Sequence, residues 1–339
     1  MKQLLSKNRN YYKANLHCHS TVSDGKCTPQ ELKTAYRKEG YSIIAFTDHN
    51  VMIPHHDLSD DNFLALTGYE IDLCEDYSVV GFPKVKACHL CLISLEKDKQ
   101  QQICWHRTDY LQSNAVNYRD KVCFDETEPD FVRVYGPECI NEIIRRGREA
   151  NFFVTYNHPK WSMESLEQYK YYKNMNAVEI YNNMSFIEGR DEYNPDVYDD
   201  LLRDGKRIYC IATDDTHSFH PFGSPYNDSF GGFTMIQAEC LTYESVAESL
   251  KNGNFYASTG PLIYDLSFND GKVSIECSDS KVISLTTGIR TVQTVRAEKD
   301  KSVSKAVFDV GKGDVYFRIT VTDEHGKYAN TNAYFIDEL

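Results

Sequence analysis

Short apolar runs alternate with amphipathic stretches over residues 1–260, a pattern typical of strands and helices that follow one another along the chain. The apolar runs that we predict as strands are 14–19, 41–46, 63–66, 85–95, 152–156, 177–181 and 207–212. The amphipathic stretches that we predict as helices are 29–39, 136–149, 195–204 and 242–252. Strands that alternate with helices in this way predict a barrel or an open α/β sheet, with the functional site at the carboxyl ends of the strands.

The pattern changes after residue 261, where short alternating runs replace the helical stretches. Asn269-Asp270-Gly271 has the composition of a tight hairpin turn between two of these runs. We therefore predict a small C-terminal all-β, sandwich-like domain over 261–339, suited to packing or oligomerisation rather than chemistry. Residues 96–135 are irregular, polar and aromatic, and we interpret them as an insertion or rim on the first domain, which spans 1–260.

A capping box marks the start of the first predicted helix. In Thr28-Pro29-Gln30-Glu31, the threonine is suited to the N-cap, the proline to the first turn and the glutamate to the reciprocal capping position.

Composition limits the classes of partner. The chain has 339 residues, of which 41% are hydrophobic and 26% charged, as in ordinary globular proteins. Its net charge of -13 argues against binding to duplex nucleic acid or to an anionic membrane, whereas bound metal ions could still attract a small anionic substrate. No signal peptide or long apolar segment is apparent, and the 11 scattered cysteines are typical of reduced thiols, so we expect a cytoplasmic protein. Cys88-His89-Leu90-Cys91 leaves a redox role open, but weakly.

Histidines and carboxylates recur where the predicted strands lie. His17 and His19 are two residues apart, so on an extended chain both imidazoles share one face, and the Asp24-Gly25 turn follows. Collecting such polar residues along the chain gives the following set: His17, His19, Asp24, His49, Glu70, His89, His158, Asp215 and His217. A single histidine is most simply a core or surface residue, but this combination of imidazoles and carboxylates suits divalent transition metals. In Asp214-Asp215-Thr216-His217 the period of two favours Asp215 as the ligand, with Asp214 pointing away.

The motifs resemble those of the PHP family (polymerase and histidinol phosphatase). The resemblance covers about residues 12–260 and rests on His17-Cys18-His19 with Asp24-Gly25, Thr47-Asp48-His49-Asn50, Asn157-His158-Pro159 and Asp215-Thr216-His217, with Glu70 and His89 placed by their order. It implies an α/β fold of the distorted (β/α)7 TIM-like barrel type, with the site at the carboxyl ends of the strands.

The resemblance also implies up to three divalent ions (Zn, Mn or Fe) in a trinuclear site. The implied ligands are His17, His19, Glu70 and Asp215 for the first ion, Glu70 (bridging), His89 and His158 for the second, and Asp24, His49 and His217 for the third. Two close ions can share a hydroxide that attacks phosphorus in line, and no nucleophilic side chain is then needed. The residues that we expect to be catalytic are Glu70, Asp215 and His217. Asp48 is interpreted either as a carboxylate that orients an imidazole or as part of an ordinary turn.

The expected activity is that of a hydrolase, a metal-dependent phosphoesterase acting on a phosphomonoester or a small nucleotide phosphodiester. The expected partner is a small phosphorylated substrate, which could be a nucleotide or a short oligonucleotide, and the C-terminal domain offers a surface for oligomers. Lys160, Arg133 and Arg190 are candidate phosphate-binding residues. The alternatives are a non-catalytic metal-binding or interaction module, a metallohydrolase acting on a non-phosphate substrate, and a carbohydrate-active enzyme.

Overall fold

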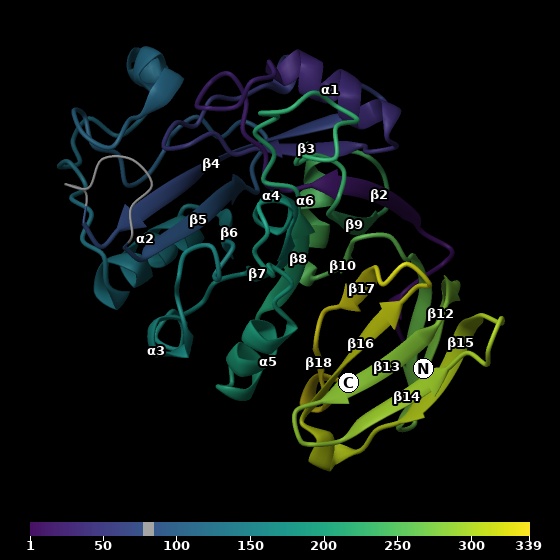
Figure 1. Ribbon diagram of the computed structural model, residues 1–339. Helices are drawn as coiled ribbons and strands as arrows, with labels where there is room; N and C mark the ends of the chain where they lie inside the picture. Colours follow the sequence, from purple (N-terminus) through teal and green to yellow (C-terminus); the bar gives the residue numbers. More distant parts are fainter. Residues whose placement is uncertain (77–84) are drawn as a thin grey trace.

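The structure is a computed structural model that describes residues 1–76 and 85–339. Two β-sheets form the framework of the fold (Figure 1). The larger is a 14-stranded sheet with the strand order β14-β13-β16-β17-β10-β9-β2-β3-β4-β5-β6-β7-β8, and β18 pairs with β16. Its strands are β2 (Asn10–Asn15), β3 (Ile43–Phe46), β4 (Leu64–Cys74), β5 (Ala87–Ser94), β6 (Phe152–Tyr156), β7 (Ala177–Asn182), β8 (Tyr209–Thr213), β9 (Phe233–Ala238), β10 (Phe255–Ser258), β13 (Val282–Thr287), β14 (Val292–Arg296), β16 (Tyr316–Thr322), β17 (Tyr328–Thr331) and β18 (Tyr334–Phe335). The smaller sheet contains, in order, β1 (Lys2–Leu5), β11 (Ile263–Asn269), β12 (Lys272–Ser280) and β15 (Val303–Asp309).

The strand directions in the large sheet are mixed. β2, β3 and β4 are parallel, as are β6, β7 and β8, whereas β5 is antiparallel to both of its neighbours. The β4–β5 ladder runs from Gly68 opposite Ile93 to Cys74 opposite Ala87. Because β5 runs opposite to β4 and β6, its amino end lies at the same edge of the sheet as their carboxyl ends. Residues near the start of β5 can therefore join a site at that edge.

The predicted (β/α)7 barrel is not confirmed, because the described strands form an open sheet that ends at β8 and β14. β8 packs against β9 and β10 without pairing to either along the backbone. Side-chain hydrogen bonds replace backbone pairing between β8 and β9. The Thr234 hydroxyl of β9 accepts from the amide of Ala212 in β8 (3.3 Å) and donates to its carbonyl (3.0 Å). The fold is therefore a mixed α/β structure with a large open sheet.

Among the described residues, six α-helices flank the sheet. They are α1 (Pro29–Lys38), α2 (Pro137–Glu149), α3 (Leu166–Tyr169), α4 (Asn183–Ile187), α5 (Pro195–Arg203) and α6 (Tyr243–Asn252). Four of them (α1, α2, α5 and α6) lie where the amphipathic pattern predicts them, whereas the short α3 and α4 were not predicted. α2 packs against β6, α5 against β7 and α6 against β9. The predicted capping box of α1 is confirmed, since the Thr28 hydroxyl accepts from the Glu31 amide and the Glu31 carboxylate accepts from the Thr28 amide. No helix among the described residues combines the length and the hydropathy needed to cross a bilayer.

Residues 96–135 lie on top of the loops that follow β2 and β3. The segment contains a 3-10 helix over Ser113–Lys121, and its buried Trp105 and Ala115 pack with Val22 and Val51 of those two loops. The rim thus contacts chain segments that directly follow two of the predicted ligands.

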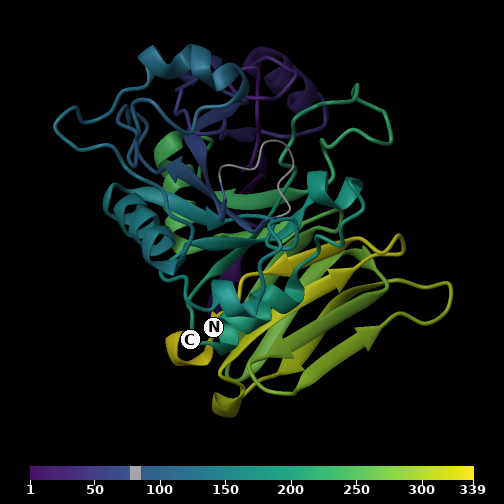
Figure 2. The ribbon, with the colours of Figure 1, turned by 60° about the vertical axis from the view of Figure 1, so that its left-hand side comes forward.

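The C-terminal strands form a β unit that lies beside the α/β part (Figure 2). The predicted hairpin turn is confirmed: Asn269 pairs with Lys272, and Asp270 and Gly271 both have positive φ (47° and 73°), as a type I′ turn requires. The amino-terminal strand β1 pairs with β11, so both chain ends lie in this unit, where the Lys2 ammonium donates to the Glu338 carbonyl. The domain boundary at residue 260 stays a prediction.

Candidate metal centre

All nine residues predicted as ligands lie together at one edge of the large sheet. Their nitrogen and oxygen atoms form four overlapping groups, within each of which the atoms lie within 4.8 Å of one another. The groups are His19, Asp24, His49 and His217; His17, His19 and Glu70; His17, His158 and Asp215; and His49, Glu70 and His89. Because the groups share members, the division into three metal ions stays a prediction.

The elements deliver these side chains in different ways. β2 ends at Asn15, so His17 and His19 lie in the extended segment beyond it, where Cys18 bridges to Thr216. Glu70 lies inside β4 and not just past a short strand as predicted, because β4 continues to Cys74. His89 lies near the start of the reversed strand β5 and therefore reaches the same edge.

His17 and His19 point to a common space, as their spacing predicts. Their Nε2 atoms are 3.1 Å apart. Oδ1 of Asp215 lies 3.1 Å from Nε2 of His17 and 3.0 Å from Nε2 of His19. Two imidazoles and a carboxylate therefore converge on one small volume.

Glu70 is the central carboxylate of the site, and its side chain is buried. It lies within ion-pair distance of five imidazoles: His17 (3.2 Å), His19 (3.5 Å), His49 (3.1 Å), His89 (3.3 Å) and His158 (3.4 Å). A single carboxylate in contact with so many ligand-type nitrogens is suited to bridging neighbouring metal ions.

The open side of the centre is formed by Asp24 and His49. Their side chains are 29% and 21% exposed, whereas those of His17, His19 and Glu70 are at most 1% exposed. The Asp24 carboxylate lies 3.7 Å from His49 and 3.5 Å from His217. A molecule from solvent can therefore reach the centre at this corner.

Buried polar atoms without hydrogen-bond partners indicate that these residues fit a metal centre. His19 Nδ1, His89 Nδ1 and Asp215 Oδ1 are buried and have no hydrogen-bond partner among the described residues. Asp215 Oδ1 nevertheless lies 3.0 Å from an imidazole nitrogen, and His89 Nδ1 lies 3.3 Å from a Glu70 oxygen. Buried polar atoms are seldom left unpaired, and atoms crowded in this way without hydrogen-bond geometry are arranged for a cation between them.

Charges in the centre shift the pKa values strongly. Burial opposes ionisation of Asp24, but His49 and His217 outweigh it and hold the Asp24 pKa well below its usual range. Burial lowers the pKa of His217, but Asp24 reverses this and raises it to about 10. Burial also lowers the pKa of His158, but the hydrogen bond to Glu70 and the charge of Asp215 raise it to about 9. His19, buried beside two other imidazoles, has its pKa lowered to about 3. In the metal-free protein these shifts favour ionised carboxylates, and the raised pKa values of His17, His158 and His217 mean that metal ions would compete with protons there.

The Asp214 and Asp48 carboxylates accept hydrogen bonds from loops next to the centre and belong to none of the four groups. Asp214 points away from it, as predicted, and accepts from the Tyr36 hydroxyl and from the amides of the loop 230–232. Asp48 accepts from the amides and hydroxyls of Ser20 and Ser23. Asp48 therefore holds the loop after His19 in place. Of the two predicted roles, its contacts agree with part of a turn and not with orienting an imidazole.

The predicted phosphate-binding cations are engaged elsewhere. Arg133 is buried, and its Nη1 donates to Asn50 Oδ1 (2.6 Å) and lies 3.2 Å from Asp72 Oδ1. The Lys160 ammonium donates to the Tyr193 carbonyl, and Arg190 lies near Glu188 on the surface. Arg133 approaches the centre through Asp72, which lies on the same face of β4 as Glu70.

Several neighbouring residues were not predicted. The buried Glu179 of β7 accepts from His17, and Trp161 packs against His89 and His158. Phe219 stacks on His217, with ring centroids 5.3 Å apart and an interplanar angle of 15°. The signal for Glu179 was a lone carboxylate inside an otherwise apolar strand. Phe219 follows His217 by two residues, which is too common a pattern to be informative.

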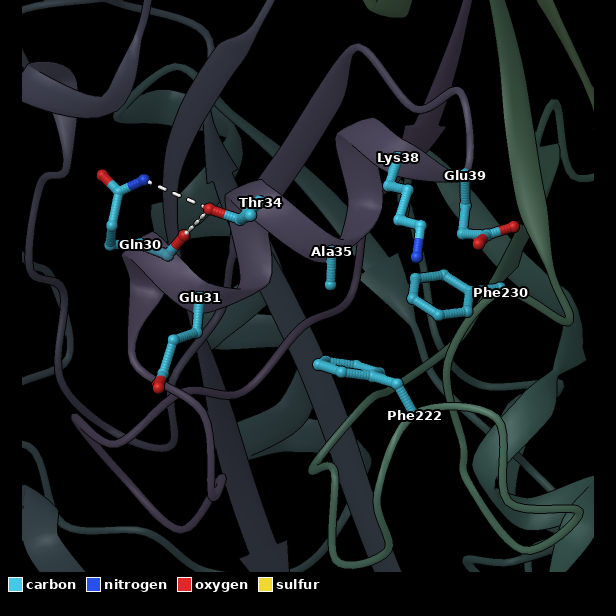
Figure 3. A pocket seen from close by; sticks show the side chains of 8 residues that line it. All are labelled: Gln30, Glu31, Thr34, Ala35, Lys38, Glu39, Phe222 and Phe230. Carbon is cyan, nitrogen blue, oxygen red and sulfur yellow. Dashed lines mark hydrogen bonds between the residues drawn. The ribbon is translucent and has the colours of Figure 1, made fainter.

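A separate cavity of about 390 Å³ lies between α1 and the loop 218–232 (Figure 3). It is lined by Gln30, Glu31, Thr34, Ala35, Lys38, Glu39, Phe222 and Phe230. None of the nine residues of the centre lines it, so it is not the metal centre.

The fold and the centre together define a class: α/β proteins that hold a cluster of histidines and carboxylates at a sheet edge, suited to several divalent ions. Within this class, the PHP domain model matches residues 15–215, and the chain belongs to the PHP domain family. A search of curated proteins finds no match.

Among solved structures, the chain is similar to a two-domain protein containing a predicted PHP-like metal-dependent phosphoesterase from Bacteroides vulgatus (16% identity, covering 99% of this chain and 97% of that chain, TM-score 0.45). It is also similar to a candidate metal-dependent phosphoesterase from Bifidobacterium adolescentis (16% identity, 63% and 91%, TM-score 0.40). A third is an amidohydrolase from Chromobacterium violaceum with bound sulfate and no metal (10% identity, 60% and 87%, TM-score 0.38). The family assignment rests on the domain match.

Proposed function

We propose that this PHP-family protein is a metal-dependent phosphoesterase that hydrolyses a phosphomonoester or a small nucleotide phosphodiester. The observation that carries the proposal is the convergence of nine histidines and carboxylates from distant parts of the chain in four overlapping groups. A centre of this kind is suited to phosphoryl transfer, in which charge builds up on several oxygens at once.

The ions would be held by the four groups, with Glu70 common to two of them. Divalent ions bound there would supply Lewis-acid activation of water and neutralise the oxygens of the phosphoryl group. We propose Glu70, Asp215 and His217 as the residues closest to the reacting group. Glu70 lies at the middle of the imidazoles, and Asp215 and His217 follow β8 with Oδ1 and Nδ1 3.8 Å apart. Zn, Mn and Fe all suit this mixture of nitrogen and oxygen ligands.

The open corner supports a substrate with a planar group. The Phe219 ring, half exposed and stacked on His217, lies next to the corner, and the exposed Lys26 ammonium lies 5.2 Å from the same ring. No carboxylate among the described residues forms an ion pair with Lys26. One face of the Phe219 ring is covered by His217 and Lys26 lies over the ring, so an unsaturated ring could stack on Phe219 when the Lys26 side chain swings aside to neutralise a second anionic group. This pair favours a nucleotide over an aliphatic phosphomonoester.

The test is hydrolysis of phosphorylated metabolites by protein loaded with Mn²⁺ or Zn²⁺. We expect activity to disappear with a chelator and to return with the metal. His17→Ala and His49→Ala should each reduce kcat/KM at least about 100-fold, because each removes a ligand atom from two of the groups. His325→Ala is the matched control, since His325 is exposed in the C-terminal unit and should leave activity unchanged. Unchanged phosphate release in both ligand variants would contradict the proposal.

A non-catalytic metal-binding module is the main alternative. It predicts the same metal content per chain but no hydrolysis of any substrate in the screen. The presence of all nine side chains favours catalysis, because a module that only binds metal needs fewer. Turnover of esters or amides without phosphate release would instead indicate a metallohydrolase for a non-phosphate substrate.

A further inference from the structure

One buried carboxylate contacts the centre without belonging to any of the four groups. Glu179 of β7 is fully buried and accepts four hydrogen bonds. Its Oε1 accepts from His17 Nδ1 (2.7 Å) and from the Thr213 hydroxyl (2.7 Å). Its Oε2 accepts from the His158 amide (2.8 Å) and from the Asn182 side-chain amide (2.9 Å).

These contacts lead to every member of one group. Glu179 reaches His17 through its ring and His158 through its backbone. It reaches Asp215 through Asn182, whose Nδ2 lies 2.9 Å from Glu179 Oε2 and 3.2 Å from Asp215 Oδ2. His17, His158 and Asp215 form one of the four groups. A single side chain therefore links all three of these candidate ligands.

The bond to His17 also decides which ring nitrogen is available. When Nδ1 donates its proton to Glu179, the lone pair of Nε2 points toward Glu70 and Asp215, 3.2 Å and 3.1 Å away. A carboxylate behind a metal-binding imidazole fixes the tautomer and the ring orientation and makes the other nitrogen a stronger donor.

We propose that Glu179 is the positioning residue of the His17–His158–Asp215 group and sets its affinity for a divalent ion. The proposal rests on the proposed function only in that the centre binds metal, and it concerns a residue outside the nine. Thr213 supports Glu179 from the far side, since its hydroxyl donates to the oxygen that accepts from His17.

Glu192 offers a matched control. It is also fully buried, and it accepts from the amides of Lys160 and Trp161, in the loop that follows His158. Its carboxylate also accepts from Asn194, and among the described residues it forms no hydrogen bond with a candidate ligand. Glu192→Gln therefore removes the same charge from a buried site next to the same loop, without touching His17.

The experiment measures Zn²⁺ binding to metal-free protein by competition with a coloured chelator, together with the number of ions bound per chain. Glu179→Gln should reduce the Zn²⁺ affinity of the His17–His158–Asp215 group by about 10- to 100-fold, the usual effect of losing a hydrogen-bond partner behind a metal ligand. The other ions should bind as before. Thr213→Val, which keeps Glu179, should reduce the affinity for the same ion by a few-fold. Glu192→Gln, which keeps every hydrogen bond to His17 and His158, should change Zn²⁺ affinity far less than Glu179→Gln does.

A purely structural role would give a different result. Urea unfolding of the metal-free variants would then show lost stability while the folded fraction binds Zn²⁺ as the wild type does, which would overturn the proposal. If Glu179→Gln does not fold, unchanged Zn²⁺ affinity in folded Thr213→Val overturns it equally. Failure of the wild type to bind any metal would instead contradict the proposed function, and binding without hydrolysis would leave the role of Glu179 standing.

Discussion

At the residue scale, the candidate metal centre balances the negative charge of its carboxylates against the positive charge of the surrounding imidazoles. Asp24, Glu70 and Asp215 all have pKa values held below their usual range by the surrounding imidazoles, although burial opposes this. In the absence of metal ions, protons on His158 and His217 supply the compensating charge.

Stability of the metal-free protein should therefore fall with rising pH. The pKa values of His158 and His217 are raised to about 9 and about 10, so their contribution is complete below the unfolded value of 6.5. It is lost as the pH rises through 9 and 10. We expect the free energy of unfolding in urea with chelator to decrease by the order of a few kcal/mol between about pH 6.5 and 10.

Saturating Zn²⁺ should remove this decrease, because deprotonated imidazoles bind the metal. The same urea series with Zn²⁺ is the control. A metal-free protein whose stability rises over this range would contradict the charge balance described above.

Phe219 should affect some substrates and not others. Stacking of a base on an aromatic ring is worth about 1–3 kcal/mol, so Phe219→Ala should raise KM for a nucleoside monophosphate at least about fivefold. KM for an aliphatic phosphomonoester should stay the same. Phe222→Ala, in the same loop but lining the separate cavity, is the matched control. Equal effects of Phe219→Ala on both substrates would exclude a stacking role.

The identity of individual site residues was predictable where the polar type itself carries the signal. His17 and His19 point to the same space, as their spacing predicts. Asp214 points away, although Asp215 has a positive φ and not the extended backbone that the period-two argument assumed. The role of His17, His19 and Asp215 as metal ligands stays a prediction. Glu179 was not predictable, because a carboxylate in a buried strand is informative only when its partners are known. Its hydrogen bonds join residues far apart in sequence.

At the scale of elements, the loop after β2 depends on a close backbone approach. A Cβ on Gly25 would lie 2.6 Å from the His19 carbonyl oxygen and 2.8 Å from the Ser20 nitrogen. These are backbone atoms of the candidate ligand His19 and of its neighbour, so they cannot move aside without displacing the His19 ring. Glycine is therefore required here by space rather than by an unusual φ.

Gly25→Ala should destabilise the protein by about 1–3 kcal/mol, the usual cost of forcing atoms into a filled site, and should also weaken metal binding. Urea unfolding and Zn²⁺ competition would measure the two effects. Gly313→Ala, where a Cβ would meet nothing within 4 Å, should change neither. Full metal affinity in Gly25→Ala would show that the loop can shift without moving His19.

Elements with local signals were predicted well, and those fixed by long-range contacts were not. The start of α1 follows from its capping box, and the β11–β12 hairpin from Asp270-Gly271. β4 was predicted too short because Thr67, Glu70 and Asp72 are polar yet buried in the strand. The direction of β5 and the pairing of β1 with β11 depend on distant partners and leave no local pattern.

At the scale of the whole molecule, a buried ion pair ties the C-terminal β unit to the α/β part. Arg318 of β16 donates to Asp199 of α5 through two bonds, Nε–Oδ1 (2.7 Å) and Nη2–Oδ2 (2.8 Å). Both residues are buried, at 4% and 8% exposure. Such a pair adds little net energy, but it is costly to break on one side only.

Asp199→Ala should therefore cost about 3–5 kcal/mol, because it leaves the Arg318 charge buried without its partner. The double variant with Arg318→Met should cost less than Asp199→Ala alone. Urea unfolding of the two single variants and the double variant measures this coupling. Asp337→Asn, which removes an exposed carboxylate from Arg207, is the control and should change little. Additive costs would show that the pair is not coupled.

The spread of the nine residues along the chain also has a kinetic consequence. They run from His17 to His217 and lie in the loops after four strands, inside β4 and near the start of β5. An unfolded chain cannot gather them, since each group needs contacts between distant segments. Metal ions should therefore bind only after most of the sheet has formed, and should slow unfolding far more than they speed folding.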